Sequence, residues 1–133
     1  MHKKPFDGTK GIYNKSLIIS KDNHKVYSPP FNIGGEKWEF HKNDEDPCPS
    51  VPHGHSRDGK RKLDIVTGYI YDVRTNKILR KANRKELAKL KTDYKFRIFA
   101  RETLEIFINT NPIKNFNYPE WILINIVNPE EKE

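Results

Sequence analysis

The sequence is poor in cysteine and in apolar residues, and these shortages exclude several classes of protein. Its single cysteine, Cys48, cannot form a disulfide within the chain, so a disulfide-stapled scaffold is excluded. No apolar run approaches the ~20 residues that a membrane-spanning helix needs. The basic residues 1–5 are not followed directly by an apolar segment, which argues against a signal peptide. The simplest expectation is a cytoplasmic protein without a membrane partner.

Aromatic residues make up for the shortage of aliphatic ones. Only 35% of the 133 residues are apolar and 32% are charged, but 11% carry a large aromatic ring. Such rings bury much area per residue, and this content argues against global disorder. We therefore expect one folded domain over residues 1–133, with flexible ends at 1–11 and 128–133.

The net charge of +7 is concentrated in the middle of the chain. Residues 57–101 contain 15 lysines and arginines but 5 aspartates and glutamates, a local balance of +10. The rest of the chain is slightly acidic, with 10 basic and 13 acidic residues. A concentrated positive surface favours an anionic partner, most often RNA or another nucleic acid. A lysine-rich surface that is merely solvated is the alternative.

Alternation of apolar and polar residues, with turn residues between, predicts an antiparallel sheet. The expected strands are residues 12–20, 25–27, 36–41, 63–67, 69–73 and 77–81. The last two, joined by a turn at 74–76, form the clearest hairpin. The apolar run 121–127 is expected to be a buried final strand that rejoins the sheet.

Apolar residues recur at helical spacing from residue 84 to residue 110. Asn83 is a suitable N-cap, and Glu86 three residues later gives a capping-box pattern. Thr92 and Asp93 can cap a second helix, so the segment is one bent helix or two. The expected fold is α+β: a small antiparallel sheet of about five to six strands, with one bent helix or two helices packed on one face.

Residues 42–61 are expected to form one long functional loop. This stretch holds the only cysteine, several acids and prolines, and the pair His53 and His55. A connection of this length is unusual in a compact domain, which favours a functional role. The alternative is a stiff proline-rich connection whose histidines only form hydrogen bonds with the backbone.

The two histidines and the basic region that follows them suggest chemistry on phosphodiesters. On an extended backbone, side chains two residues apart point to the same side, and histidine can donate or accept a proton near neutral pH. Cleavage of RNA by its own 2′-hydroxyl needs a base, an acid and a cation for the phosphate. We therefore predict His53 and His55 as the catalytic acid and base. The predicted phosphate ligands are Arg57, Lys60, Arg61, Arg74, Arg80 and Arg84.

A small basic α+β domain with a histidine loop beside a sheet resembles the architecture of bacterial ribonuclease toxins. The sequence thus predicts a metal-independent endoribonuclease of toxin type, with RNA and a protein inhibitor or antitoxin as partners. One alternative is a non-enzymatic nucleic-acid or protein-binding module. Another is a small zinc-binding domain that uses Cys48, His53, His55 and Asp46. Because no Cys-x-x-Cys motif is present and no histidine follows His55, the expected cofactor is none, with zinc as the alternative.

Overall fold

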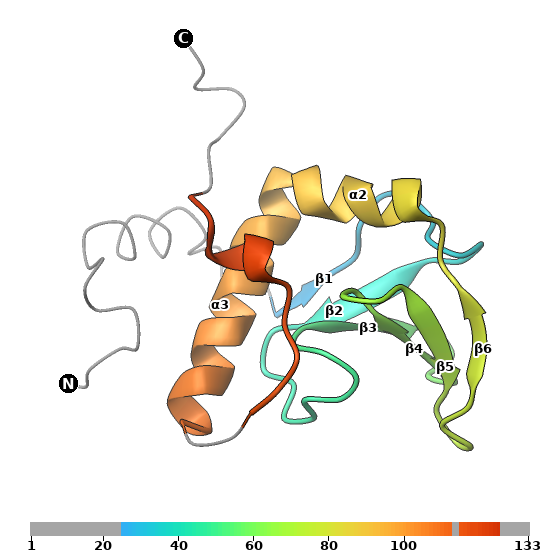
Figure 1. Cartoon of the computed structure of the whole chain (residues 1–133), viewed down its shortest axis with the longest axis horizontal. Coiled ribbons are helices and arrows are strands. Elements are labelled where there is room, and N and C mark those ends of the chain that lie inside the picture. Colours follow the sequence, from blue (N-terminus) through green and yellow to red (C-terminus); the bar gives the residue numbers. More distant parts are fainter. Residues whose placement is uncertain (1–24, 113–114, 126–133) are drawn as a thin grey trace, which may run out of the picture.

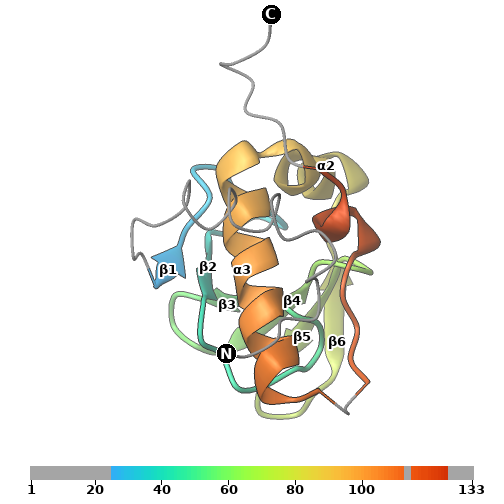
Figure 2. The same ribbon diagram turned by 90° about the vertical axis from the view of Figure 1, so that its left-hand side faces the viewer.

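The computed structural model describes residues 25–112 and 115–125. Its centre is a six-stranded antiparallel sheet in the order β1-β2-β3-β4-β5-β6, so each strand pairs with the next one along the chain (Figures 1 and 2). The strands are β1 (Val26–Tyr27), β2 (Trp38–His41), β3 (His53–Ser56), β4 (Arg61–Asp64), β5 (Tyr69–Asp72) and β6 (Ile78–Lys81).

Two helices cover one face of the sheet. α2 (Arg84–Thr92) follows β6, and α3 (Tyr94–Thr110) runs across the strands in Figure 2. The Phe96 ring of α3 packs edge-on against the Phe40 ring of β2, with centroids 4.8 Å apart. Leu90 of α2 joins the same buried cluster. The predicted α+β fold, a sheet with two helices on one face, is confirmed.

The core face of the sheet explains which way the histidines of β3 point. Its fully buried apolar residues are Trp38, Phe40, Leu63 and Ile70. Gly54 lies among them, and a Cβ at that position would come within 3.2 Å of both Trp38 Cε3 and Leu63 Cβ. Since side chains alternate along a strand, His53 and His55 lie on the opposite face, away from the helices.

The prediction of one loop over 42–61 is corrected by β3. This His-Gly-His-Ser strand lacks the β-branched and aromatic residues that usually mark a strand, and it forms because both its neighbours pair with it. Its partners in β4 are given by the pairs His53 with Asp64, Gly54 with Leu63 and His55 with Lys62. The long loop is therefore 42–52, and residues 57–60 form a tight turn between β3 and β4.

The segment 84–110 is two helices, separated by one residue. The backbone N–H of Asp93 donates to Leu90 O and ends α2, while its side chain accepts from Lys95 N and begins α3. The predicted N-cap Asn83 is also confirmed, since its side chain accepts from Lys85 N. The two-helix alternative is therefore the correct one.

Glu86 does not close the predicted capping box. Its Oε1 accepts a hydrogen bond from Gly34 N at 2.9 Å instead. Gly34 has a φ of 63°, in the left-handed region that glycine tolerates, and it lies in the turn before β2. Glu86 thus fastens this turn to the first turn of α2.

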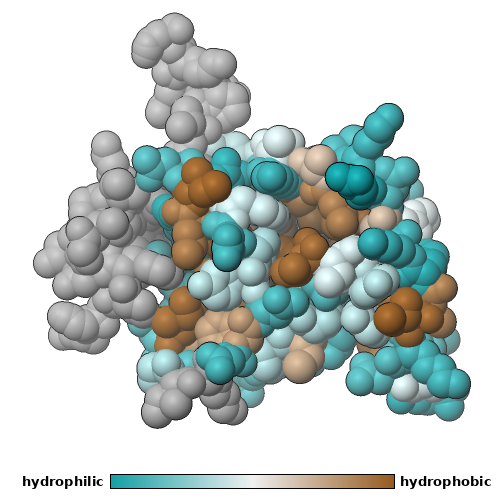
Figure 3. Space-filling model, viewed as in Figure 1, coloured by the Kyte–Doolittle hydropathy of each residue, from teal (hydrophilic) through white to brown (hydrophobic). Residues whose placement is uncertain are grey.

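The strands that follow the loop lie close to their predicted positions. β4 ends at Asp64, three residues before the expected end, because the Asp64 carboxylate accepts from Val66 N and from the Thr67 hydroxyl and forms a turn. β5 and β6 form the predicted hairpin. Figure 3 shows hydrophobic side chains over this hairpin, where Val73, Ile78 and Leu79 are exposed.

The expected final strand over 121–127 is wrong in its described part. Residues Glu120–Leu123 form a 3-10 helix, η2, in which Ile122 is buried. Arg101 of α3 donates to Leu123 O at 2.7 Å, and Arg97 donates to Trp121 O at 3.2 Å. The apolar run therefore packs on α3 and satisfies its carbonyls there, without joining the sheet.

Some predictions fall outside the described residues: the strand at 12–20, the flexible ends at 1–11 and 128–133, and the last two positions of the run 121–127. β1 is described, and it pairs with β2. None of the helices in the described part of the chain is both long and apolar enough to cross a membrane.

Replacing Asp93 with alanine should lower the free energy of unfolding by about 1–2 kcal/mol. The change removes the N-cap of α3 and also the acceptor of the Tyr27 hydroxyl, which lies 2.6 Å from Asp93 Oδ2. Burial, together with this contact, raises the pKa of Tyr27, so its hydroxyl stays protonated and needs an acceptor. Urea unfolding measures the loss. Asp93→Asn keeps a capping side chain and should lose less than Asp93→Ala; equal losses would contradict the capping role.

Candidate functional site

Strands β2 to β5 present one row of polar side chains on the face away from the helices. The register places Glu39 opposite His55, His55 opposite Lys62, and Lys62 opposite Tyr71. Adjacent strands lie ~4.8 Å apart, so each member of the row is next to its neighbour. All four residues are partly exposed. A carboxylate, an imidazole, an ammonium group and a phenol are therefore accessible on one surface.

Asp44, from the loop 42–52, contacts both histidines of β3. Its Oδ2 lies 2.7 Å from His55 Nε2 and 3.2 Å from His53 Nε2. Burial disfavours the charged carboxylate, but hydrogen bonds from His55 and from the Asp46 amide, with the two imidazoles close by, lower the pKa of Asp44 to about 2. Asp44 is therefore an anion at neutral pH and fixes the orientation of His55.

His53 is buried, with 2% of its surface exposed. Its Nδ1 lies 2.8 Å from Ser50 O, and because a carbonyl only accepts, Nδ1 carries the proton. Burial lowers the pKa of His53, and the contacts with Ser50 and Asp44 offset this only in part. In the neutral ring Nε2 then carries a lone pair, and it has no hydrogen-bond partner among the described residues. A side chain so deeply buried does not touch a substrate, and His53 instead contacts Asp44 and Ser50 of the loop 42–52.

His55 is the accessible member of the pair, with 23% of its side chain exposed. When its Nε2–H donates to Asp44, the neutral ring keeps a lone pair on Nδ1. The ring stacks on His41 of β2, with centroids 4.3 Å apart and planes 9° from parallel. One donor atom each from His41, Asp44 and His55 lie within 4.8 Å of one another. His41, which the sequence did not indicate as a site residue, is therefore part of this cluster.

The ligand set of the zinc alternative is divided in the structure. Asp46 pairs with Lys62 Nζ, and that ammonium group also lies 3.4 Å from Cys48 O. The Cys48 side chain is exposed. His53 and His55 contact Asp44 and not Asp46. The residues that gather around the two histidines are thus Asp44 and His41.

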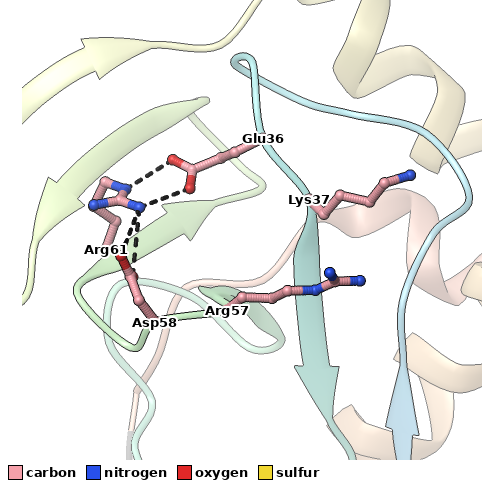
Figure 4. Close-up of a pocket in the computed structure, with 5 residues that line it drawn as sticks. All are labelled: Glu36, Lys37, Arg57, Asp58 and Arg61. Carbon is pink, nitrogen blue, oxygen red and sulfur yellow. Dashed lines mark hydrogen bonds and ion pairs between the residues drawn. The ribbon is translucent and has the colours of Figure 1, made fainter.

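Two of the six predicted phosphate ligands, Arg61 and Arg80, form ion pairs with the partly buried carboxylate of Glu36. Arg61 binds Glu36 through two hydrogen bonds of 2.8 and 2.9 Å (Figure 4). Arg80 binds the same carboxylate at 2.7 Å. Burial opposes ionisation of Glu36, but these two guanidinium groups outweigh it and lower its pKa. Asp58 adds a third contact to Arg61. Arg61 and Arg80 therefore stabilise the start of β2 and are largely neutralised.

Three of the remaining cations gather at one end of the sheet. Arg57 and Lys60 lie in the β3–β4 turn and Arg74 in the β5–β6 turn, and the two turns are joined by a bond of 2.9 Å from Val73 N to Lys60 O. All three are exposed and form no ion pair within residues 25–112 and 115–125. Arg84 lies at the start of α2, beyond the other end of β6.

A shallow pocket of about 230 Å³ adjoins this end of the sheet. On one side of the pocket Arg61 forms ion pairs with Glu36 and Asp58. Arg57 and Lys37 extend away from these three residues (Figure 4). Lys37 precedes β2 and was not predicted from the sequence as a site residue. Its place beside Arg57 depends on the pairing of β2 with β3.

No protein-family model matches this chain, and neither a curated protein nor a solved structure matches it. Its function must therefore be inferred from the geometry of the site itself.

Proposed function

We propose that this protein binds RNA and cleaves it without a metal ion, with His55 as the catalytic base. The observation that carries the proposal is the row His55–Lys62–Tyr71 on an accessible strand face. The row supports the proposal because it places a cation between a proton acceptor and a proton donor. That is the set of groups that cleavage by a 2′-hydroxyl requires.

Each member of the row has one role in the proposed reaction. His55 Nδ1 takes the proton from the 2′-hydroxyl while the O2′–phosphorus bond forms. The phosphorus–O5′ bond breaks, and the Tyr71 hydroxyl donates its proton to O5′. Lys62 stabilises the charge on the non-bridging oxygens. The products are a 2′,3′-cyclic phosphate and a 5′-hydroxyl.

Three acids support these roles indirectly. Asp44 holds the proton of His55 on Nε2, and so leaves Nδ1 free to act as a base. Burial, and then the charge of Asp64, raise the pKa of Tyr71, which keeps its hydroxyl protonated at neutral pH and able to donate. Asp46 fixes Lys62 beside His55, although it also reduces the local positive charge.

The exposed cations at the end of the sheet supply affinity for the RNA backbone. Arg57, Lys60 and Arg74 lie on the turns that continue from β3, β4 and β5, next to the row. Contacts between such side chains and phosphates carry no sequence information and weaken with salt. A toxin-type ribonuclease in the cytoplasm, restrained by a protein inhibitor, is the biological setting that we propose for this activity.

The purified protein should cleave an RNA oligonucleotide in the presence of EDTA but leave unchanged the same oligonucleotide with 2′-deoxyribose throughout. The reason is that the attacking 2′-oxygen is missing in the second substrate. Mass spectrometry of the products should show the 2′,3′-cyclic phosphate. Cleavage of both substrates would exclude the 2′-hydroxyl mechanism, and salt-sensitive binding without any cleavage would indicate the non-enzymatic binding module instead.

A further inference from the structure

One buried polar atom at the centre of the site, His53 Nε2, has no hydrogen-bond partner among the described residues. This nitrogen carries a lone pair, because the ring proton is on Nδ1, which donates a hydrogen bond to Ser50 O. It faces Asp44 Oδ2 at 3.2 Å, and that oxygen is also an acceptor. Two acceptors at this separation repel each other, and the buried Nε2 has no hydrogen to accept, while Asp44 Oδ2 also accepts from His55. A bound cation would satisfy both.

The groups around this atom are suitable ligands for zinc. His41, Asp44 and His55 bring imidazole nitrogens and a carboxylate oxygen within 4.8 Å of one another. Zinc prefers such N and O donors in a tetrahedral site, with bonds of ~2.0–2.2 Å that place ligand atoms roughly 3.3 Å apart. The separation of 3.2 Å from Asp44 Oδ2 to His53 is close to that value, and the separation of 2.7 Å to His55 is that of the hydrogen bond which the ion would replace.

The hydrogen bond on the far side of His53 has the form found in metal sites. A metal-bound histidine usually donates its other N–H to a backbone carbonyl or a carboxylate, which fixes the ring and its tautomer. His53 does this to Ser50 O. His41 lies on the solvent side of the set, where 42% of its side chain is exposed and its ring stacks on that of His55.

We infer that His41, Asp44, His53 and His55 bind one Zn²⁺ ion. Because zinc would bind His55 through Nε2, the proton of that ring would move to Nδ1. Nδ1 is the atom assigned above as the base for RNA cleavage. Zinc therefore acts as an inhibitor of the cleavage reaction, and this second step rests on the proposed function while the metal site does not.

The metal site is tested by titrating the untagged, EDTA-treated full chain with Zn²⁺ in a calorimeter, and with Co²⁺ followed by visible absorption. The wild type should bind one equivalent, with the absorption of a tetrahedral Co²⁺ site. Asp44→Asn and His55→Gln should each weaken zinc binding by at least ~100-fold, since each removes a ligand.

Two matched variants serve as controls. Asp46→Asn changes the other aspartate of the same loop, which pairs with Lys62, and Cys48→Ser removes the exposed thiol. Both should bind zinc as the wild type does. The inference is overturned if the wild type takes up less than ~0.1 equivalent near neutral pH. It is also overturned if Asp44→Asn binds normally, or if the two controls lose as much affinity as the ligand variants.

The same samples separate this inference from the proposed function. RNA cleavage by the metal-free protein that stops at one equivalent of zinc would support both. Zinc binding by a protein that cleaves no RNA would support the metal site and overturn the proposed function. Cleavage that persists unchanged in the zinc-loaded protein would overturn the inhibitory step.

Discussion

Replacing His55 with glutamine should lower the rate of RNA cleavage by ~10²–10⁴-fold, the range expected when a general base is lost. Glutamine cannot take up the proton of the 2′-hydroxyl. Its amide N–H can still donate to Asp44, so the loop 42–52 should keep its place. Single-turnover cleavage of one RNA substrate measures the rate, and thermal unfolding shows that the fold is retained.

His53→Gln is the matched comparison, two residues away on the same strand face. Its ring touches Ser50 and Asp44 and is buried, so the change should lower the free energy of unfolding by about 1–3 kcal/mol, because buried partners are left unsatisfied. The expected result is therefore a split: the His55 variant loses rate, and the His53 variant loses stability. A His55 variant that cleaves RNA at the wild-type rate would refute the assignment.

The parts of the fold that sequence predicted well are those encoded by neighbouring residues. The hairpin of β5 and β6 has strong strand formers on both sides of a turn, such as Tyr69, Ile70 and Tyr71. Asp93 lies where one helical pattern stops and the next begins, and it caps both helices. Such signals are local, so a single sequence contains them.

β3 and η2 could not be predicted because distant contacts decide them. The residues of β3 have little strand preference of their own, and they form a strand because β2 and β4 pair with them on both sides. The apolar run after Pro119 reads as a strand, but arginines of α3 bind its carbonyls and hold a 3-10 turn. Tertiary contacts override the local preference in both cases.

The candidate site shows the same division. The sequence indicated His55 by its spacing from His53, but it could not show that a loop buries one ring and leaves the other accessible. Nor could it show that Arg61 and Arg80 both bind Glu36, which precedes them by 25 and 44 residues in the chain. Pairing across strands, and not spacing along the chain, decides which polar side chains are free for a ligand.

The site also depends on the core beneath it. Gly54 separates the two histidines and brings the strand against the Trp38 ring, which lies 3.2 Å from the position of a Cβ on Gly54. Trp38 Nε1–H in turn donates to Ile33 O at 2.7 Å. The position of His55 therefore depends on a ring that no substrate touches.

Replacing Trp38 with alanine should lower the free energy of unfolding by about 3–5 kcal/mol, a large part of the total stability of a domain of this size. The ring is 1% exposed, so its loss leaves a cavity under β3 and removes the shorter of the two hydrogen bonds to Ile33 O. Trp38→Phe keeps much of the ring and should lose less, about 1–2 kcal/mol, through the lost hydrogen bond and the smaller volume. Urea unfolding of the three proteins measures both steps. A Trp38→Ala variant within about 1 kcal/mol of the wild type would contradict the view that this ring supports the strand of the histidines.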